Sequence, residues 1–201
     1  HLEALTSFPV ERKVSPNCWA AILDGGLDAY RSRLSYKARK IVRDSESAIG
    51  TGVGQFEIAQ TIEQALDFVD KIEHMHQARW REKDIEGCFT ASSFKIFLTS
   101  AIRQMWHEPW FGTHDTPVVE STSVQRVQVA LLRIQGVPAA GCICYLDRDS
   151  LATYLTGMDT HFAEHRPGWM LNTCIIKRAM ALGCTRLDFL RGDEDYKERL
   201  G

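Results

Sequence analysis

The chain lacks the stretches that would insert it into a membrane or mark it for export. Among its 201 residues, no apolar run approaches the roughly 20 residues that a bilayer-spanning helix needs. No charged stretch followed by an apolar one indicates a signal peptide. The formal net charge is only -2, so any surface that attracts polyanions must be local. We therefore expect a cytoplasmic protein that neither enters a membrane nor binds DNA.

The sequence also lacks the spacings typical of metal and disulfide sites. Its six cysteines include no Cys-x-x-Cys pair, and most lie in apolar surroundings, which indicates reduced, buried thiols. Cys142 and Cys144 would point to the same side of a strand, but they have no further ligands nearby. His74 and His76 stand two apart on an expected helix and so point in different directions. We predict no metal.

Three common catalytic fingerprints are missing as well. No serine stands in a nucleophile elbow, and there is no glycine-rich dinucleotide motif. The glycines at 50, 52 and 54 lack a following Lys-Ser/Thr and precede a strand rather than a helix, so a phosphate loop is not indicated. With 44% hydrophobic and 25% charged residues, the chain nevertheless has the composition of a globular protein with a real core.

The first half reads as mainly helical. After an irregular start with a short strand at 18–23, apolar residues recur at spacings of three and four. They predict helices at 27–48, 61–85 and 92–107, with a turn and a strand between the first two. Thr61 and Gln64 suggest a capping box, and Ser92 or Ser93 a cap.

In the second half of the chain the spacing of apolar residues changes. Alternating apolar segments separated by short turns predict an antiparallel meander of three strands. A loop, a helix at 169–183 and a strand at 185–190 follow. Because a helix joins this last strand to the meander, we expect it to lie parallel to its neighbour. The fold class is therefore mixed α/β (α+β), with helices flanking one sheet.

The segment before the last of these helices has the features of an anion site. Arg166 is followed by a Pro-Gly turn and then by Trp169, Met170 and Leu171. The unpaired N–H groups and positive dipole end of a helix N-terminus suit a phosphate. An ordinary helix start with proline in its first turn is the alternative.

Two concentrations of charge stand out. One follows the final strand, where five charged residues gather around a glycine: Arg191, Asp193, Glu194, Asp195 and Lys197. It is either a solvated turn or the edge of a cleft. The other is the basic face of the helix at 27–48, which is either solvated or binds an anion.

These segments together resemble a known family. "LSYKARKIVR", "HMHQARW", "GVPAAGCICYL", "YLTGMD" and "RPGWMLNTCIIKRAMALGCTRLDFLRGDEDYKERLG" are similar to GNAT-type N-acetyltransferases associated with cellulose biosynthesis, relatives of the Fem-type peptidoglycan aminoacyltransferases. The likeness covers most of residues 15–201. It implies that residues 1–26 are the tail of a mostly missing GNAT-like half, and that 27–201 are a GNAT-like domain truncated at its C-terminus.

The resemblance implies an N-acyltransferase that moves an acyl group, in most cases acetyl, from acyl-CoA to an amine. The acceptor would be a small molecule or a saccharide in polysaccharide or cell-envelope metabolism. The donor would lie between the two parallel strands, held by Arg166, Gly168, Trp169 and Met170. Only Gly168 matches the usual glycines of that loop, which leaves an acyl-carrier protein open as the donor.

The resemblance also implies roles for the closing turn. Asp193 or Glu194 would act as the base, and Tyr196 would protonate the leaving thiolate. Arg191 and Lys197 would hold an anionic substrate or the phosphates of the donor, with Asp188 orienting Arg191. Lys37, His76 and Arg79, from the two supporting motifs, complete the expected substrate-binding residues.

Two alternatives stay open at this stage. One is a Fem-like transferase that uses aminoacyl-tRNA. The other is a non-catalytic GNAT-like module whose basic helix binds an anionic polymer, in a manner that weakens steeply with salt.

Overall fold

A six-stranded mixed sheet runs through the centre of the computed structural model, which describes residues 17–110 and 124–201 except residue 193. The strand order is β1-β8-β7-β6-β5-β2. The strands are β1 (Cys18–Ile22), β2 (Gly54–Ile58), β5 (Val127–Ile134), β6 (Val137–Asp147), β7 (Ser150–Met158) and β8 (Arg186–Arg191). Two short strands, β3 (Pro109–Trp110) and β4 (Val124–Gln125), pair separately.

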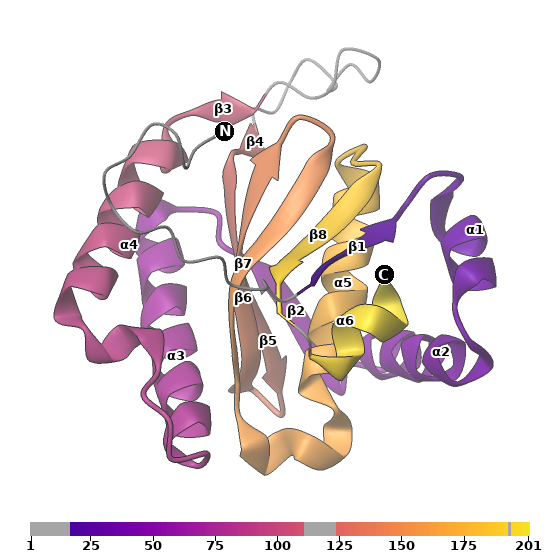
Figure 1. Ribbon diagram of the computed structural model, residues 1–201, viewed down its shortest axis with the longest axis horizontal. Helices are drawn as coiled ribbons and strands as arrows, with labels where there is room; N and C mark the ends of the chain where they lie inside the picture. Colours follow the sequence, from indigo (N-terminus) through magenta and orange to yellow (C-terminus); the bar gives the residue numbers. More distant parts are fainter. Residues whose placement is uncertain (1–16, 111–123, 193) are drawn as a thin grey trace, which may run out of the picture.

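Helices cover both faces of the sheet (Figure 1). One face carries α3 (Ile62–Arg81) and α4 (Ser92–Trp106). A short 3-10 helix, η1 (Cys88–Thr90), precedes α4. The other carries α5 (Pro167–Ala181), with α2 (Tyr36–Gly50) packed on α5 and α1 (Gly26–Arg33) beyond it. A 3-10 helix, η2 (Thr160–His165), leads into α5, and α6 (Asp195–Leu200) closes the chain.

The predicted mixed sheet is confirmed. Strands β5, β6 and β7 form the antiparallel meander, and β8, which follows α5, pairs parallel with β7. The pairing partners Ser150↔Arg186, Leu151↔Leu187 and Ala152↔Asp188 define this parallel contact. The parallel pair thus lies near the middle of the sheet, where both faces are covered.

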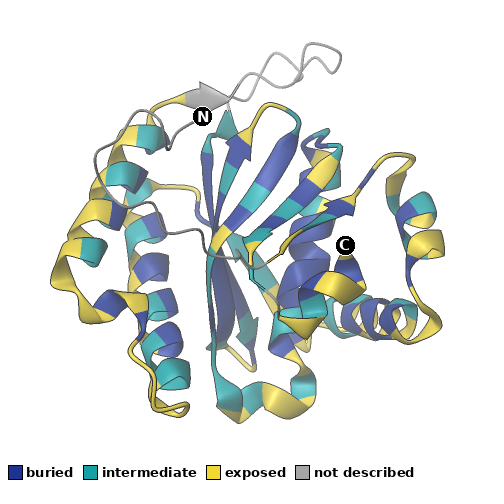
Figure 2. Cartoon of the chain, in the orientation of Figure 1, coloured by how far each residue is buried: buried dark blue, intermediate teal, exposed yellow. Residues whose placement is uncertain are grey.

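Two buried clusters fill the spaces between sheet and helices (Figure 2). On the α5 side, Leu171, Ile175 and Ala179 pack on Cys142 and Cys144 of β6. On the α3 side, Phe68 and other apolar residues of α3 and α4 pack on alternate residues of β5 and β6. Four cysteines are buried as expected, namely Cys142, Cys144, Cys174 and Cys184, whereas Cys18 and Cys88 are exposed.

Two glycines allow α3 to approach the sheet very closely. Gly141 and Gly157 are partners across β6 and β7. A Cβ atom at Gly157 would lie 2.5 Å from the Ile72 carbonyl oxygen, and one at Gly141 would lie 2.6 Å from Ile72 Cγ1. The backbone of α3 therefore rests directly on the two strands. His76 lies about one helical turn after Ile72, and Arg79 about two turns after it. The close contact at Ile72 therefore sets the distance of these two residues from β7.

The single helix predicted at 27–48 is wrong, because the chain forms two helices there. Leu34 adopts an extended conformation, and the Ser35 side chain accepts a hydrogen bond from the Ala38 amide, which starts α2 as a separate helix. The apolar spacing continued across the break because Tyr30 of α1, Leu34 at the break, and Ala38 and Ile41 of α2 are all buried.

The helix caps agree with the sequence only in part. Thr61 Oγ1 accepts from the Gln64 amide as predicted, but Gln64 Oε1 accepts from the amide of Gln60 rather than that of Thr61. Helix α3 ends at Arg81, four residues before the predicted end. The cap predicted at Ser92 or Ser93 is wrong, since Ala91 holds that position and provides no side-chain hydrogen bond. The domain boundary at residue 26 stays a prediction. Strand β1, which precedes this boundary, pairs antiparallel with β8 of the same sheet.

Candidate active site

The parallel strands β7 and β8 separate after three paired residues. Beyond Ala152 and Asp188, β7 continues along β6, whereas the end of β8 pairs with β1. A bulge on β7 adds to the divergence: Thr153 is opposite Cys144 and Leu155 is opposite Ile143, so Tyr154 is an extra residue. Bulges bend a strand and take backbone groups out of the ladder. Two cavities lie where the strands diverge.

The first cavity, here called the donor cavity, has a volume of about 270 Å³. The N-terminus of α5 forms one side of it through Arg166, Pro167, Gly168, Trp169, Leu171 and Asn172, and β7 contributes Thr156, Gly157 and Met158. Its wall is largely apolar. This shape and lining suit a slender, partly apolar ligand that ends in an anionic group at the helix terminus.

The second cavity, here called the acceptor cavity, has a volume of about 200 Å³ and is more polar. Helix α3, the bulged part of β7 and the closing turn surround it. Three residues, Arg79, Thr156 and Tyr196, line both cavities. The two cavities are therefore neighbours that share Tyr196 in their walls.

Tyr196 is held as a neutral phenol. Its ring packs edge-on against Phe189 at a centroid distance of 6.0 Å. Burial raises the pKa of Tyr196 to about 12, with Glu194 adding to the rise and Arg79 opposing it. A tyrosine with such a pKa keeps its proton at neutral pH, so the Tyr196 hydroxyl is available as a hydrogen-bond donor to a group in the cavity.

The turn that follows β8 is built around Gly192. A Cβ atom there would lie 2.2 Å from Glu194 Oε2 and 2.7 Å from Lys197 Nζ, and the φ of +141° also favours glycine. Lys197 is buried; its Nζ donates to the Arg191 carbonyl oxygen at 2.9 Å and lies 3.0 Å from Glu194 Oε2. Arg191, Glu194 and Lys197 all line the acceptor cavity. The predicted base Asp193 lies outside the described residues.

Asp188 differs from its expected role of orienting Arg191. Its Oδ1 accepts a hydrogen bond from the Leu190 amide at 2.7 Å, and no ion pair joins it to Arg191 in the described part of the chain. Leu190 has a φ of +55°, which is uncommon for a non-glycine residue. Asp188 thus stabilises the turn of the backbone at the end of β8.

Helix α3 brings His76 and Arg79 to the acceptor cavity, and their expected role in binding substrate stays a prediction. His76 is buried, and burial lowers its pKa, so the imidazole is neutral. Its Nε2 accepts a hydrogen bond from Trp80 Nε1 at 2.8 Å, which assigns the ring proton to Nδ1. His76 therefore orients Trp80, a further lining residue, and its Nε2 lone pair is not available as a base.

The amides at the start of α5 are less available than predicted. Those of Trp169 and Met170 both donate to the Arg166 carbonyl oxygen, at 2.9 and 3.2 Å, so the expectation of free amides was wrong for these two. The Gly168 amide has no acceptor among the described residues. Arg166 is exposed in a left-handed conformation, with a φ of 51°. Met170 is buried in the core and does not line the donor cavity.

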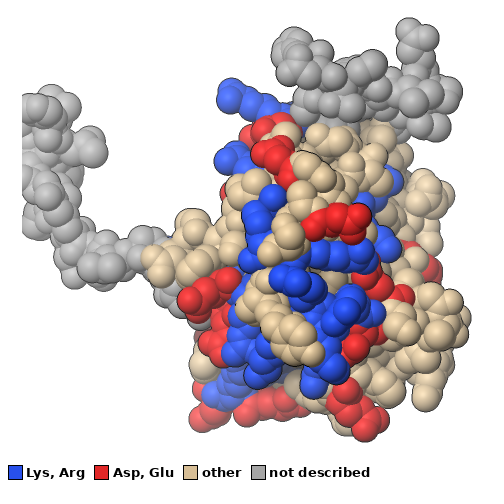
Figure 3. Space-filling view, turned by 90° about the vertical axis from the view of Figure 1, so that its right-hand side faces the viewer, with Lys and Arg blue, Asp and Glu red and all other residues tan. Residues whose placement is uncertain are grey.

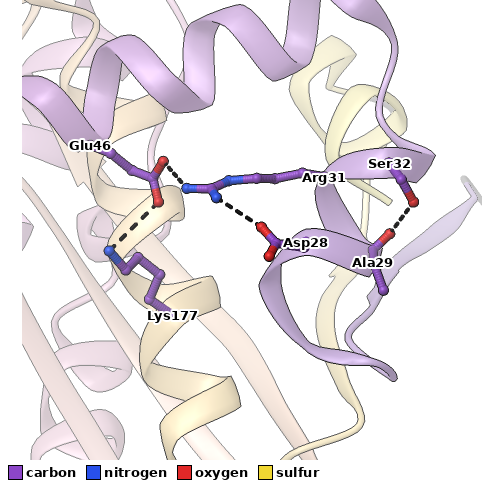
Figure 4. Close-up of polar contacts among 6 residues, drawn as sticks. All are labelled: Asp28, Ala29, Arg31, Ser32, Glu46 and Lys177. Carbon is purple, nitrogen blue, oxygen red and sulfur yellow. Dashed lines mark hydrogen bonds and ion pairs between the residues drawn. The ribbon is translucent and has the colours of Figure 1, made fainter.

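The basic residues of α2 line neither cavity, but Lys40 lines a neighbouring cavity together with Arg166, which also lines the donor cavity. Figure 3, which views the side carrying α1 and α2, shows a cluster of Lys and Arg bordered by Asp and Glu. Part of this charge is neutralised: Arg31 pairs with Asp28 and Glu46, and Glu46 also pairs with Lys177 of α5 (Figure 4). Lys37 is exposed on α2 and lines neither cavity. Its expected role in binding substrate stays a prediction.

Sequence reasoning missed several lining residues, among them two threonines and two residues at the end of the expected helix at 61–85. Thr153 and Thr156 were read only as part of a strand, and Trp80 and Lys83 only as part of a helix. The available signal was a pair of threonines in an otherwise apolar strand just before the predicted anion site. No helix of the described residues is long and apolar enough to cross a membrane, and no group of three or more His, Cys, Asp or Glu among them could hold a metal.

Solved structures with the same fold have sequences that differ widely from this one. FemX superposes with a TM-score of 0.62 at 9% identity, over 89% of this chain and 53% of FemX. A conserved protein of unknown function from Bacteroides thetaiotaomicron superposes with a TM-score of 0.59 at 11% identity, over 99% of this chain and 60% of its own. L-PGS from Bacillus licheniformis gives a TM-score of 0.50 at 12% identity, over 87% and 44% of the two chains.

The chain thus spans only about half of the length of these structures, and at such identities the likeness shows the fold alone. No curated protein sequence matches the chain. The model of one protein family does match, over residues 35–198, and its description is "acetyltransferase (GNAT) domain". The match includes the diverging strands, the start of α5 and the Tyr196 turn, and the chain belongs to this GNAT domain family.

Proposed function

We propose that the chain is an N-acyltransferase that moves an acyl group, in the first instance acetyl, from acyl-CoA to an amine. The observation that carries the proposal is that the donor and acceptor cavities share Tyr196 in their walls, where the strands β7 and β8 diverge. In this arrangement the acyl-thioester arm lies in the donor cavity with its phosphates toward Arg166 and the Gly168 amide. The amine approaches from the acceptor cavity.

The reaction needs one bond formed and one broken. The amine nitrogen attacks the thioester carbonyl, a C–N bond forms, and the C–S bond breaks. The proton that the amine loses goes to Glu194, directly or through water, and Tyr196 gives its proton to the departing thiolate. The Tyr154 bulge interrupts the regular pairing of β7 with β6, and we expect a backbone N–H group at this bulge to stabilise the oxyanion. Proton transfer from Glu194 to Tyr196 through solvent restores the starting state.

The choice of acyl-CoA over other donors rests on the size and lining of the donor cavity. An acyl-carrier protein would bring the same phosphopantetheine arm, so it stays an alternative donor. A role in polysaccharide or cell-envelope metabolism follows only from the sequence resemblance. Neither an aminoacyl-tRNA donor nor a binding-only role is favoured by a specific observation, because part of the basic face on α1 and α2 is already paired with carboxylates.

Release of the thiol from acetyl-CoA in the presence of a panel of primary amines tests the proposal. We expect amine-dependent release that stops when the donor cavity is filled by Gly168→Trp. Amine-independent hydrolysis only, or no release with acetyl-CoA and with longer acyl-CoAs, would refute an acyl-CoA-dependent N-acyltransferase.

A further inference from the structure

The acceptor cavity has a strong excess of positive charge. Arg79, Lys83, Arg191 and Lys197 line it, and the opposing carboxylate among the described lining residues is Glu194. Glu194 pairs with Lys197, so this pair is close to neutral. The other three cations have no carboxylate partner among the described residues, and the charge of Asp193 alone would not balance them. The full chain has a net charge of only -2, so this excess is local.

A polar group in the wall points to a ligand independently of the charge. Thr153 is only 8% exposed, lines the acceptor cavity, and its Oγ1 has no hydrogen-bond partner in the described structure. A buried hydroxyl without a partner costs free energy. The Oγ1 atom itself is shielded in this conformation, so the hydroxyl reaches a ligand oxygen in the cavity when the Thr153 side chain turns about χ1.

The position of these groups separates them from the phosphates of the donor. Lys83, Arg191 and Thr153 line the acceptor cavity but not the donor cavity. The N-terminus of α5 and Arg166 lie in the donor cavity, with Tyr196 between the two sets. A donor whose phosphates lie at α5 and whose thioester reaches Tyr196 leaves Lys83 and Arg191 without an anion.

We propose that the acceptor is an amine that also carries an oxyanion group, phosphate or carboxylate, which Arg79, Lys83, Arg191 and the Thr153 hydroxyl bind. The proposal rests on the proposed function, because it assigns the acceptor of the same site. Charge-assisted hydrogen bonds to the oxyanion would orient the amine toward the thioester. A polycationic amine would instead be repelled by the same side chains.

Matched probe pairs test this inference without any donor. The phosphate arm compares O-phosphoethanolamine with ethanolamine, and the carboxylate arm compares β-alanine with β-alanine amide. Dissociation constants come from NMR titrations of the 201-residue chain. We expect the anionic member of at least one pair to bind about tenfold more tightly than its neutral-tailed partner, as charge-assisted hydrogen bonds imply. The arm that shows the difference identifies the oxyanion. Equal binding within both pairs overturns the proposal.

Two exposed lining residues provide the variants. Arg191→Gln and Lys83→Gln should each weaken the binding of the anionic probe several-fold. Arg103→Gln is the control, because Arg103 is an exposed residue of α4 that lines neither cavity; it should leave the binding of the probe unchanged. Undiminished binding in both lining variants would refute the assigned site. Displacement of the anionic probe by CoA would also refute it, since the cations would then bind donor phosphates.

The proposed function has a separate readout. Calorimetric binding of acetyl-CoA can fail while the anionic probe still binds, and it can succeed while the probe pairs show no difference. The two proposals can therefore be refuted independently.

Discussion

At the scale of single residues, the account depends on Tyr196. This residue lines both the donor and the acceptor cavity, and burial raises its pKa to about 12. Such a group is protonated throughout the neutral range, so its hydroxyl is present as a donor to the leaving sulfur in the proposed reaction. Glu194 lines the acceptor cavity, and in the proposed reaction it takes the proton of the amine while Tyr196 acts on the leaving sulfur.

The substitution Tyr196→Phe tests the proton-donor role. It keeps the edge-on packing against Phe189 and removes only the hydroxyl. We expect kcat to fall about 100-fold, in the range of a lost general acid, while the affinity for acetyl-CoA changes little. Tyr145→Phe is the matched control, because burial raises the pKa of Tyr145 to about 12 as well, but this residue lines neither cavity. Equal rates for wild type and Tyr196→Phe would exclude the role.

At the scale of elements, the site depends on how closely α3 packs on β6 and β7. Gly157 allows the contact with the Ile72 carbonyl oxygen, and the same helix then brings His76 and Arg79 to the cavities. We predict that Gly157→Ala forces α3 away from the sheet and lowers the free energy of unfolding by about 1–3 kcal/mol, as overpacking does. Transfer activity should fall with it, because Arg79 moves.

Gly50→Ala is the control for this prediction. Gly50 ends α2, and a Cβ atom there meets no atom within 4 Å. Urea unfolding of both variants measures the difference. If Gly157→Ala were as stable as Gly50→Ala, the close packing of α3 would not be what fixes the position of this helix.

Much of this arrangement could be predicted from the sequence because it depends on local patterns. The period-two segments indicated the meander, and the helix between β7 and β8 indicated a parallel pair. The charge after β8 marked Arg191, Glu194 and Lys197. Contacts between distant segments could not be predicted in this way. The Tyr154 bulge depends on how β7 pairs with β6. The break at Ser35 depends on the hydrogen bond that the Ser35 side chain accepts from the Ala38 amide.

At the scale of the whole molecule, buried tyrosines and thiols make the free energy of unfolding depend on pH in the alkaline range. Tyr30 donates a hydrogen bond to the Leu200 carbonyl oxygen across 170 positions of the chain. Burial raises the pKa of Tyr30 well above its ordinary 10.0. It also raises the pKa values of Cys174 and Cys184 from 9.0 to about 11. In the unfolded chain these groups lose their protons at lower pH than in the folded protein.

The free energy of unfolding should therefore fall as pH rises above about 9, and more steeply above 10, because the folded state binds more protons there. Urea unfolding at pH 7.5, 9, 10 and 10.5 measures this. The variant Tyr30→Phe should show a smaller decline than wild type over the same range. An unfolding free energy that stays constant up to pH 10.5 would show that these groups are accessible to solvent in the folded protein.

The central claim is that a donor thioester lies in the cavity between the N-terminus of α5 and the diverging strands. Calorimetric titration of acetyl-CoA into the wild-type chain, Gly168→Trp and Gly50→Trp tests it most directly. Gly168 lines the donor cavity, whereas a side chain at Gly50 extends into open space. We expect acetyl-CoA to bind wild type and Gly50→Trp, and to bind Gly168→Trp at least tenfold more weakly. Absence of binding to the wild-type chain, or equal binding to all three proteins, would contradict it.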